Sequence, residues 1–272
     1  MEMFGFDAYS PQQIARRIET VGVAKARLPL LAMFVLGICA GGFIGLGALY
    51  STLIASDPAL SFATSRLLGG LSFSMGLVLV VVAGAELFTG NNLLVMAWAE
   101  RKITMVELLR NWTVVYLGNA FGAIGLAVIV WVSHHGDLGQ GAVAAQYVKI
   151  AGAKVALPFW EAFYKGVLCN LLVCLAVWMA MAGHSVTDKV VAIVFPVSAF
   201  VAAGFEHSVA NMYLIPLGIL SSHGAPSGGP VLDWPGFVSS LVPVTLGNVA
   251  GGSILVAAVY HLIYRRALKR SA

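Results

Sequence analysis

Charged side chains are scarce in this sequence. They make up 10% of its 272 residues, whereas a soluble domain carries about a quarter. Hydrophobic residues reach 59%, and the mean hydropathy is +0.88. So little charge excludes an ordinary soluble domain, in which polar and apolar faces alternate. We therefore predict an integral membrane protein.

Signatures of enzymes and metal sites are absent as well. The sequence has no H-E-x-x-H, no G-x-S-x-G and no Cys/His pair at ligand spacing. Its three cysteines, Cys39, Cys169 and Cys174, lie in apolar segments without C-x-x-C spacing, which is typical of small buried residues. The net charge of +4 comes from basic residues at the ends of apolar runs. We expect no enzymatic activity, no cofactor, no metal and no nucleic-acid partner.

What the sequence does contain is a series of long apolar runs. They fall near 30–54, 67–98, 112–133, 160–182, 190–220 and 241–263, and about 20 apolar residues suffice for one membrane-spanning helix. The second and fifth runs are longer than one span needs, and glycine and polar residues interrupt them. We predict an all-α integral membrane protein with six transmembrane helices, of which the second and fifth are broken.

The basic residues indicate how these helices are oriented. Most of the 16 Lys and Arg residues fall in segments that six spans would place on one side, namely 1–29, 99–111, 183–189 and 265–272. Because cytoplasmic segments are rich in Lys and Arg, we expect both termini to be cytoplasmic. Between Asp7 and Arg27, apolar residues such as Ile14 and Ile18 interleave with charged ones, which predicts an amphipathic helix on the membrane surface.

The two halves of the chain repeat two patterns in the same order. G-x-E-x-x-x-x-N occurs at 84–91 and again at 204–211. L-G-N, with a further glycine three residues later, follows at 117–122 and at 246–251. Each unit has three spans, an odd number, so the second must lie inverted in the membrane. Interrupted spans at matching positions of inverted repeats indicate a transport site.

This pattern divides the chain into five parts. We expect a cytoplasmic amphipathic segment (1–29), a first three-helix repeat (30–133), a connecting loop (134–159), a second three-helix repeat (160–264) and a basic cytoplasmic tail (265–272).

The predicted breaks carry polar residues that are costly inside a membrane. Glu86 and Glu206 stand at matching positions, and we expect them to support the breaks by accepting hydrogen bonds from freed backbone N–H groups. Asn91 and Asn211 would tie the same breaks from the other side. His207 has no counterpart, because Leu87 occupies the matching position. It is either a satisfied core residue or a proton donor to a passing anion.

Three segments carry a resemblance to a known family. They are Leu87-Phe88-Thr89, 169–178 with the sequence CNLLVCLAVW, and 204–212 with the sequence GFEHSVANM. From about residue 7 to about 265, the chain resembles the formate/nitrite transporter family. The resemblance implies an aquaporin-like fold, a pore in each protomer, a homopentamer and a location in the bacterial cytoplasmic (inner) membrane.

It also implies roles for individual residues. Leu87, Phe88 and Thr89 would form the loop that narrows the cytoplasmic side, with Leu77 and Val173 lining the same constriction. Phe73 and Phe200 would form the outer constriction. His207 would be the central pore histidine with Asn170 beside it, Lys154 would attract the anion, and Glu206 would brace the break.

The substrate follows from the same resemblance. Segments such as Asn111-Trp112 and Met212-Tyr213 look like those of formate channels, whereas Gly90 and Lys165 look more like those of nitrite channels. We expect a channel for a small monovalent anion, formate first and nitrite as the alternative, in which His207 protonates the anion in a pH-dependent step. Protons and the lipid bilayer are the other expected partners. A water or neutral-solute channel is the alternative from a different class.

Overall fold

The computed structural model describes residues 8–222 and 232–266, and within these ranges every regular element is a helix. Residues 1–7 of the expected N-terminal segment and 267–272 of the expected basic tail lie outside them. The first half contains α1 (Pro11–Ala26), α2 (Leu30–Ala55), α3 (Phe62–Val78), η1 (Leu79–Gly84), η2 (Gly90–Leu94), α4 (Val95–Ala99) and α5 (Met105–Val132). The second contains η3 (His135–Asp137), α6 (Ala142–Val155), α7 (Phe159–Ala180), α8 (Val186–Ala203), α9 (Ser208–Ser221), α10 (Trp234–Val249), η4 (Ala250–Ala258), α11 (Val259–His261) and η5 (Leu262–Arg266).

Six helices among the described residues are long and apolar enough to cross a membrane, which confirms the predicted number of spans. They are Leu30–Ala55, Phe62–Gly84, Met105–Val132, Phe159–Ala180, Val186–Ala203 and Trp234–Tyr264.

The third and sixth spans begin earlier than their apolar runs because polar residues cap their N-termini. Thr104 accepts a hydrogen bond from the backbone N–H of Glu107, and the Glu107 carboxylate accepts one from the N–H of Thr104. Asp233 caps the last span through the N–H of Gly236. Such caps satisfy backbone donors that the first turn of a helix leaves free.

Glycines allow the long helices to cross closely. A side chain at Gly122 on α5 would collide with the backbone of Ile38 on α2, and one at Gly251 would collide with the backbone of Val167 on α7. Small residues of this kind let helices approach in a membrane. At these glycines, α2 packs closely against α5, and α7 packs closely against the last span.

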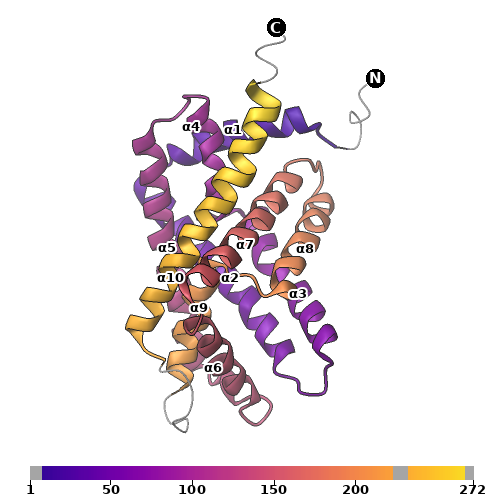
Figure 1. The fold of residues 1–272 in the computed structure, drawn as a ribbon, viewed down its shortest axis with the longest axis vertical. Helices are drawn as coiled ribbons and strands as arrows, with labels where there is room; N and C mark the ends of the chain where they lie inside the picture. The colour runs from indigo at the N-terminus through magenta and orange to yellow at the C-terminus, as the bar shows by residue number, and fades with distance from the viewer. Residues whose placement is uncertain (1–7, 223–231, 267–272) are drawn as a thin grey trace.

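The helices outside the long bundle lie at its two ends (Figure 1). α1 and α4 lie at one end and α6 at the other. α1 begins with a capping box between Ser10 and Gln13, and it buries Ile14 and Ile18 against the bundle. α1 and α6 therefore lie at opposite ends of the bundle.

Candidate functional site

Two segments in the interior of the molecule are not helical. The first follows Gly84 (φ 85°) and continues until η2 begins at Gly90. The second follows Gly204 (φ 76°) and continues until α9 begins at Ser208. Glycine adopts these positive φ values at little cost, so both helices end where the sequence places glycine.

Two buried asparagines bind the backbone freed at these segments. Asn119 accepts from the N–H of Phe88 (2.9 Å) and donates to the carbonyls of Glu86 and Gly37 (2.8 Å each). Asn248 accepts from the N–H of Ser208 and donates to the carbonyls of Glu206 and Gly166 (2.9 Å each). Each amide thus satisfies polar groups that are expensive to bury alone.

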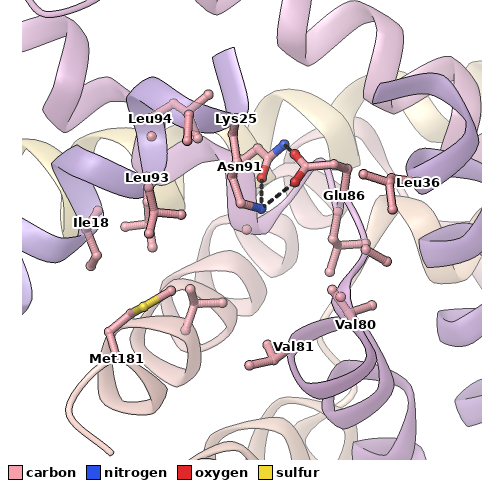
Figure 2. Close-up of a pocket in the computed structure, with 18 of the residues that line it drawn as sticks. Ile18, Lys25, Leu36, Val80, Val81, Glu86, Asn91, Leu93, Leu94 and Met181 are labelled. Atoms are coloured by element: carbon pink, nitrogen blue, oxygen red, sulfur yellow. Dashed lines mark hydrogen bonds and ion pairs between the residues drawn. The ribbon is translucent and has the colours of Figure 1, made fainter. Parts of the chain in front are cut away.

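Near each segment lies a lysine–glutamate–asparagine set, in which the glutamate and the asparagine are buried and the lysine is partly exposed. Lys25 of α1 lies 3.0 Å from the Glu86 carboxylate and donates to Asn91 Oδ1, while the Asn91 amide donates to Glu86 (2.7 Å) (Figure 2). Lys154 of α6 donates to both oxygens of Glu206 (2.9 Å each). The Asn211 amide donates to the same carboxylate (2.7 Å).

These contacts differ from the expected role of the glutamates. The Glu86 and Glu206 carboxylates bind side-chain amides and ammonium groups instead of backbone N–H groups. The freed N–H groups bind to Asn119 and Asn248, and those of Glu86 and Glu206 bind to carbonyls of α2 and α7. An amide both donates and accepts, so it can join the two strands of backbone at a break, which a carboxylate cannot.

The two non-helical segments meet at a hydrogen bond between Thr89 and His207. Thr89 Oγ1 lies 3.0 Å from His207 Nε2, and His207 Nδ1 accepts from the N–H of Ala210 (3.1 Å). Since Nδ1 is an acceptor, the neutral ring carries its proton on Nε2 and donates it to the Thr89 hydroxyl. That leaves the hydroxyl proton of Thr89 available for another acceptor.

Asn170 of α7 binds at the place where the two segments meet, which we call the junction. Its amide donates to the carbonyls of Thr89 (3.2 Å) and Asn248 (2.6 Å) and to Asn92 Oδ1 (3.1 Å). The side chain is fully buried. Asn170 therefore contacts the backbone of Thr89, whose hydroxyl group bonds to His207.

Aromatic rings cover the histidine on one side. The Phe73 and Phe200 ring centroids lie 5.7 Å apart, edge to face, and Phe200 stacks on His207 at 6.0 Å. Phe88, by contrast, packs against Tyr116 (4.8 Å) and Trp112 (6.3 Å). The ring of Phe88 therefore packs against α5, next to Thr89 in the chain.

Two cavities flank the junction. The Lys25 cavity, of about 490 Å³, is lined by Lys25, Glu86, Asn91, Leu77 and Leu87 among others. The Lys154 cavity, of about 310 Å³, is lined by Lys154, Glu206, His207, Phe73 and Phe200 among others. Thr89, Asn170 and Val173 are buried and line neither cavity.

Sequence reasoning missed Lys25, Asn119 and Asn248 as site residues. A signal for them is present: Lys25 and Lys154 are 129 residues apart, and so are Asn119 and Asn248. The L-G-N pattern identifies the asparagines only as part of a repeat. Lys25 falls in the expected surface segment, where its match with Lys154 has no evident meaning.

One cluster outside the junction has the composition of a cation site. Ligand atoms of Glu19, Glu100 and His261 lie within 4.8 Å of one another. The Lys102 ammonium group lies 2.7 Å from the Glu19 carboxylate. Because Lys102 already brings a positive charge to the cluster, we interpret the cluster as a contact that joins α1, α4 and α11.

Six membrane-capable helices and a buried polar junction between two cavities define a multi-pass α-helical membrane protein. A family model described as formate/nitrite transporter matches residues 12–262. The chain belongs to the formate/nitrite transporter family, whose members are transport proteins and not enzymes.

Relatives and solved structures agree with that family. The formate channel FocA of Escherichia coli strain K12 is 40% identical, over 96% of each chain. A pentameric formate channel with formate bound is 40% identical with a TM-score of 0.80, over 86% of this chain and 97% of that one. An FNT family ion channel is 30% identical with a TM-score of 0.83, over 92% and 98%.

Proposed function

We propose that this protein conducts a small monovalent anion across the bacterial inner membrane, and that formate is its main substrate. The observation that carries the proposal is the Thr89–His207 hydrogen bond, which lies between two cavities that each contain a lysine. The formate channels among its relatives support the choice of formate. Nitrite is the alternative within the family, because Lys165 stands in the Lys154 cavity where formate channels commonly have an apolar residue.

The path would run from one cavity to the other through the junction. Lys154 attracts the anion, and Phe73 and Phe200 form the constriction on that side. Leu77, Leu87 and Val173 form the constriction on the other. The N-termini of η2 and α9 begin beside Thr89 and His207, so their dipoles would favour negative charge there.

An apolar constriction penalises a bare anion strongly, and protonation removes that cost. A cationic His207 would transfer one proton to a formate oxygen, which leaves a neutral imidazole and neutral formic acid. The cationic ring needs a proton on Nδ1 as well, so it loses the hydrogen bond from Ala210. Thr89 would orient the anion through its free hydroxyl proton.

The larger architecture belongs to the same proposal. We infer two inverted three-helix repeats in an aquaporin-like arrangement, with broken second and fifth helices and the five-part division given above. The matched contacts of Asn119 and Asn248 support the repeat. The pentameric formate channel supports a homopentamer, and the distribution of Lys and Arg supports cytoplasmic termini.

Solute-induced swelling of proteoliposomes tests the substrate. Vesicles that contain the purified protein should take up formate faster than empty vesicles, with nitrite slower. Urea and glycerol should enter at the same rate in both. Rapid entry of the neutral solutes without either anion would favour the neutral-solute channel and would contradict the proposal.

A further inference from the structure

The two cavities have matching lysine–glutamate pairs but differ in the net charge of their linings. In the Lys25 cavity, the ammonium group of Lys25 faces the carboxylate of Glu86. In the Lys154 cavity, Lys154 and Glu206 form the matching pair. Two further cations, Arg66 and Lys165, line only the Lys154 cavity. The lining of that cavity therefore carries excess positive charge, and the lining of the Lys25 cavity does not.

Arg66 and Lys165 have no charged counterpart at the matching positions of the repeat. The spacing of 129 residues that relates Lys25 to Lys154 also relates Leu36 to Lys165. Leu36 and Lys165 even play the same backbone role, since their carbonyls accept from the N–H groups of Glu86 and Glu206. The spacing of 120 between those glutamates leads from Arg66 to Val186. At the positions that the repeat matches to Lys165 and Arg66, the other half of the chain therefore has apolar residues, Leu36 and Val186.

Arg66 is held in a defined geometry. Its Nε donates to the carbonyl of Ala202 (2.7 Å) and its Nη2 to that of Val201 (2.9 Å). The guanidinium lies directly over Gly204, where a Cβ would come within 2.8 Å of Nη2. A guanidinium has five N–H donors, so most remain for a ligand.

The charge of Arg66 is also the less compensated of the two. Lys165 forms an ion pair with Glu161 at 2.7 Å. Within residues 8–222 and 232–266, no carboxylate forms an ion pair with Arg66, which binds neutral carbonyls. Lys154, in turn, is bound by both oxygens of Glu206. Arg66 is thus the strongest free attraction for an anion in this cavity.

We propose that Arg66, assisted by Lys165, forms an anion-binding site in the Lys154 cavity that a small carboxylate such as formate occupies before it reaches Lys154 and His207. The planar guanidinium suits a carboxylate, which it binds through two parallel hydrogen bonds. This inference rests on the proposed function. It makes transport asymmetric. The half-saturating formate concentration is lower for formate that enters through the Lys154 cavity (the Lys154 face) than for formate that enters through the Lys25 cavity (the Lys25 face).

Sided transport measurements test the site. Initial rates of formate uptake are measured in right-side-out and inside-out membrane vesicles, at ionic strengths of about 0.01 M and about 0.3 M. The variants are Arg66→Gln, which removes the charge, and Arg66→Lys, which keeps it. Arg110→Gln is the matched control, because Arg110 also binds two backbone carbonyls, those of Ala26 and Leu28, but lines neither cavity.

The expected result is confined to one face. Arg66→Gln raises the half-saturating concentration on the Lys154 face about three- to tenfold at low ionic strength. Arg66→Lys raises it less, and Arg110→Gln leaves it at the wild-type value. The difference shrinks at high salt, and the Lys25 face is unaffected. If Arg66→Gln does not assemble, Lys165→Met carries the test, with a smaller rise on the same face.

Two outcomes overturn the inference and are distinguishable. If wild-type protein carries formate but the half-saturating concentrations of Arg66→Gln and Lys165→Met equal that of wild type on the Lys154 face, the site does not exist. An equal rise on both faces would exclude the site as well. If wild-type protein carries neither formate nor nitrite, the proposed function fails and the inference fails with it.

Discussion

At the scale of single residues, buried amides organise the centre of the molecule. Asn119 and Asn248 each make three hydrogen bonds to backbone groups around a non-helical segment. The sequence revealed both as parts of a repeated L-G-N pattern. It did not reveal their partners, because spacing along one helix does not specify which backbone atoms of another helix lie opposite.

Removal of one of these amides should therefore destabilise the protein. Asn119→Ala leaves one N–H and two carbonyls without their partner, at a cost of about 1–3 kcal/mol for each group that water cannot reach. We expect a clear fall in the melting temperature of the detergent-solubilised protein. Ser72→Ala is the control, since the Ser72 hydroxyl bonds only to carbonyls of its own helix. Equal melting temperatures for the two variants would contradict the structure.

The ion pair between the partly exposed Lys154 and the buried Glu206 gives a second prediction. Lys154→Met leaves a buried carboxylate without its cation, which is more costly than the loss of both charges. The double variant Lys154→Met/Glu206→Gln should therefore be more stable than Lys154→Met alone. Thermal unfolding of the wild type, of Lys154→Met, of Glu206→Gln and of the double variant gives the coupling free energy between the two side chains. We expect it to be about 1–3 kcal/mol. Additive effects would show that the two side chains do not interact.

At the scale of helices, apolar runs predicted the six spans well but their ends less well. The third span begins seven residues before its apolar run, at Met105, because Thr104 and Glu107 form a capping box. Hydropathy measures transfer into lipid and is insensitive to caps. The predicted helix near the N-terminus is present as α1, but its contact with Glu86 through Lys25 depends on tertiary packing.

Close crossing of α2 and α5 predicts contrasting effects for two glycines on the same helix. Gly122→Ala places a methyl group against the backbone of Ile38, whereas Gly125 has open space around it. We expect Gly122→Ala to reduce the yield of folded protein and Gly125→Ala to be tolerated. Monodispersity in size-exclusion chromatography is the measurement. A folded Gly122→Ala protein with wild-type stability would show that the helices do not approach as described.

At the scale of the whole molecule, much apolar surface faces outward. Phe121, Ile129 and Phe195 are each at least 66% exposed, which suits lipid or a neighbouring protomer. The composition predicted a membrane protein from this same excess of apolar residues over charged ones. The number of protomers was not derivable from composition and came from the family resemblance.

The proposed homopentamer predicts a definite mass. Native mass spectrometry of the detergent-solubilised protein should give five chains of 28.6 kDa each. Apolar surface that lipid does not cover favours such assembly. A predominant single-chain mass under mild detergent conditions would contradict the pentamer.

The role of His207 is the central claim, and the pH dependence of formate flux tests it most directly. Formate influx into proteoliposomes is measured between about pH 5.5 and about pH 7.5, because the protonated fraction of a histidine rises as the pH falls. Influx into empty liposomes is subtracted. Wild-type influx should rise as the pH falls, because more His207 then carries the proton to be transferred. His207→Phe keeps an aromatic ring beside Phe200 and should remove this rise; an unchanged pH dependence in that variant would contradict proton transfer from His207.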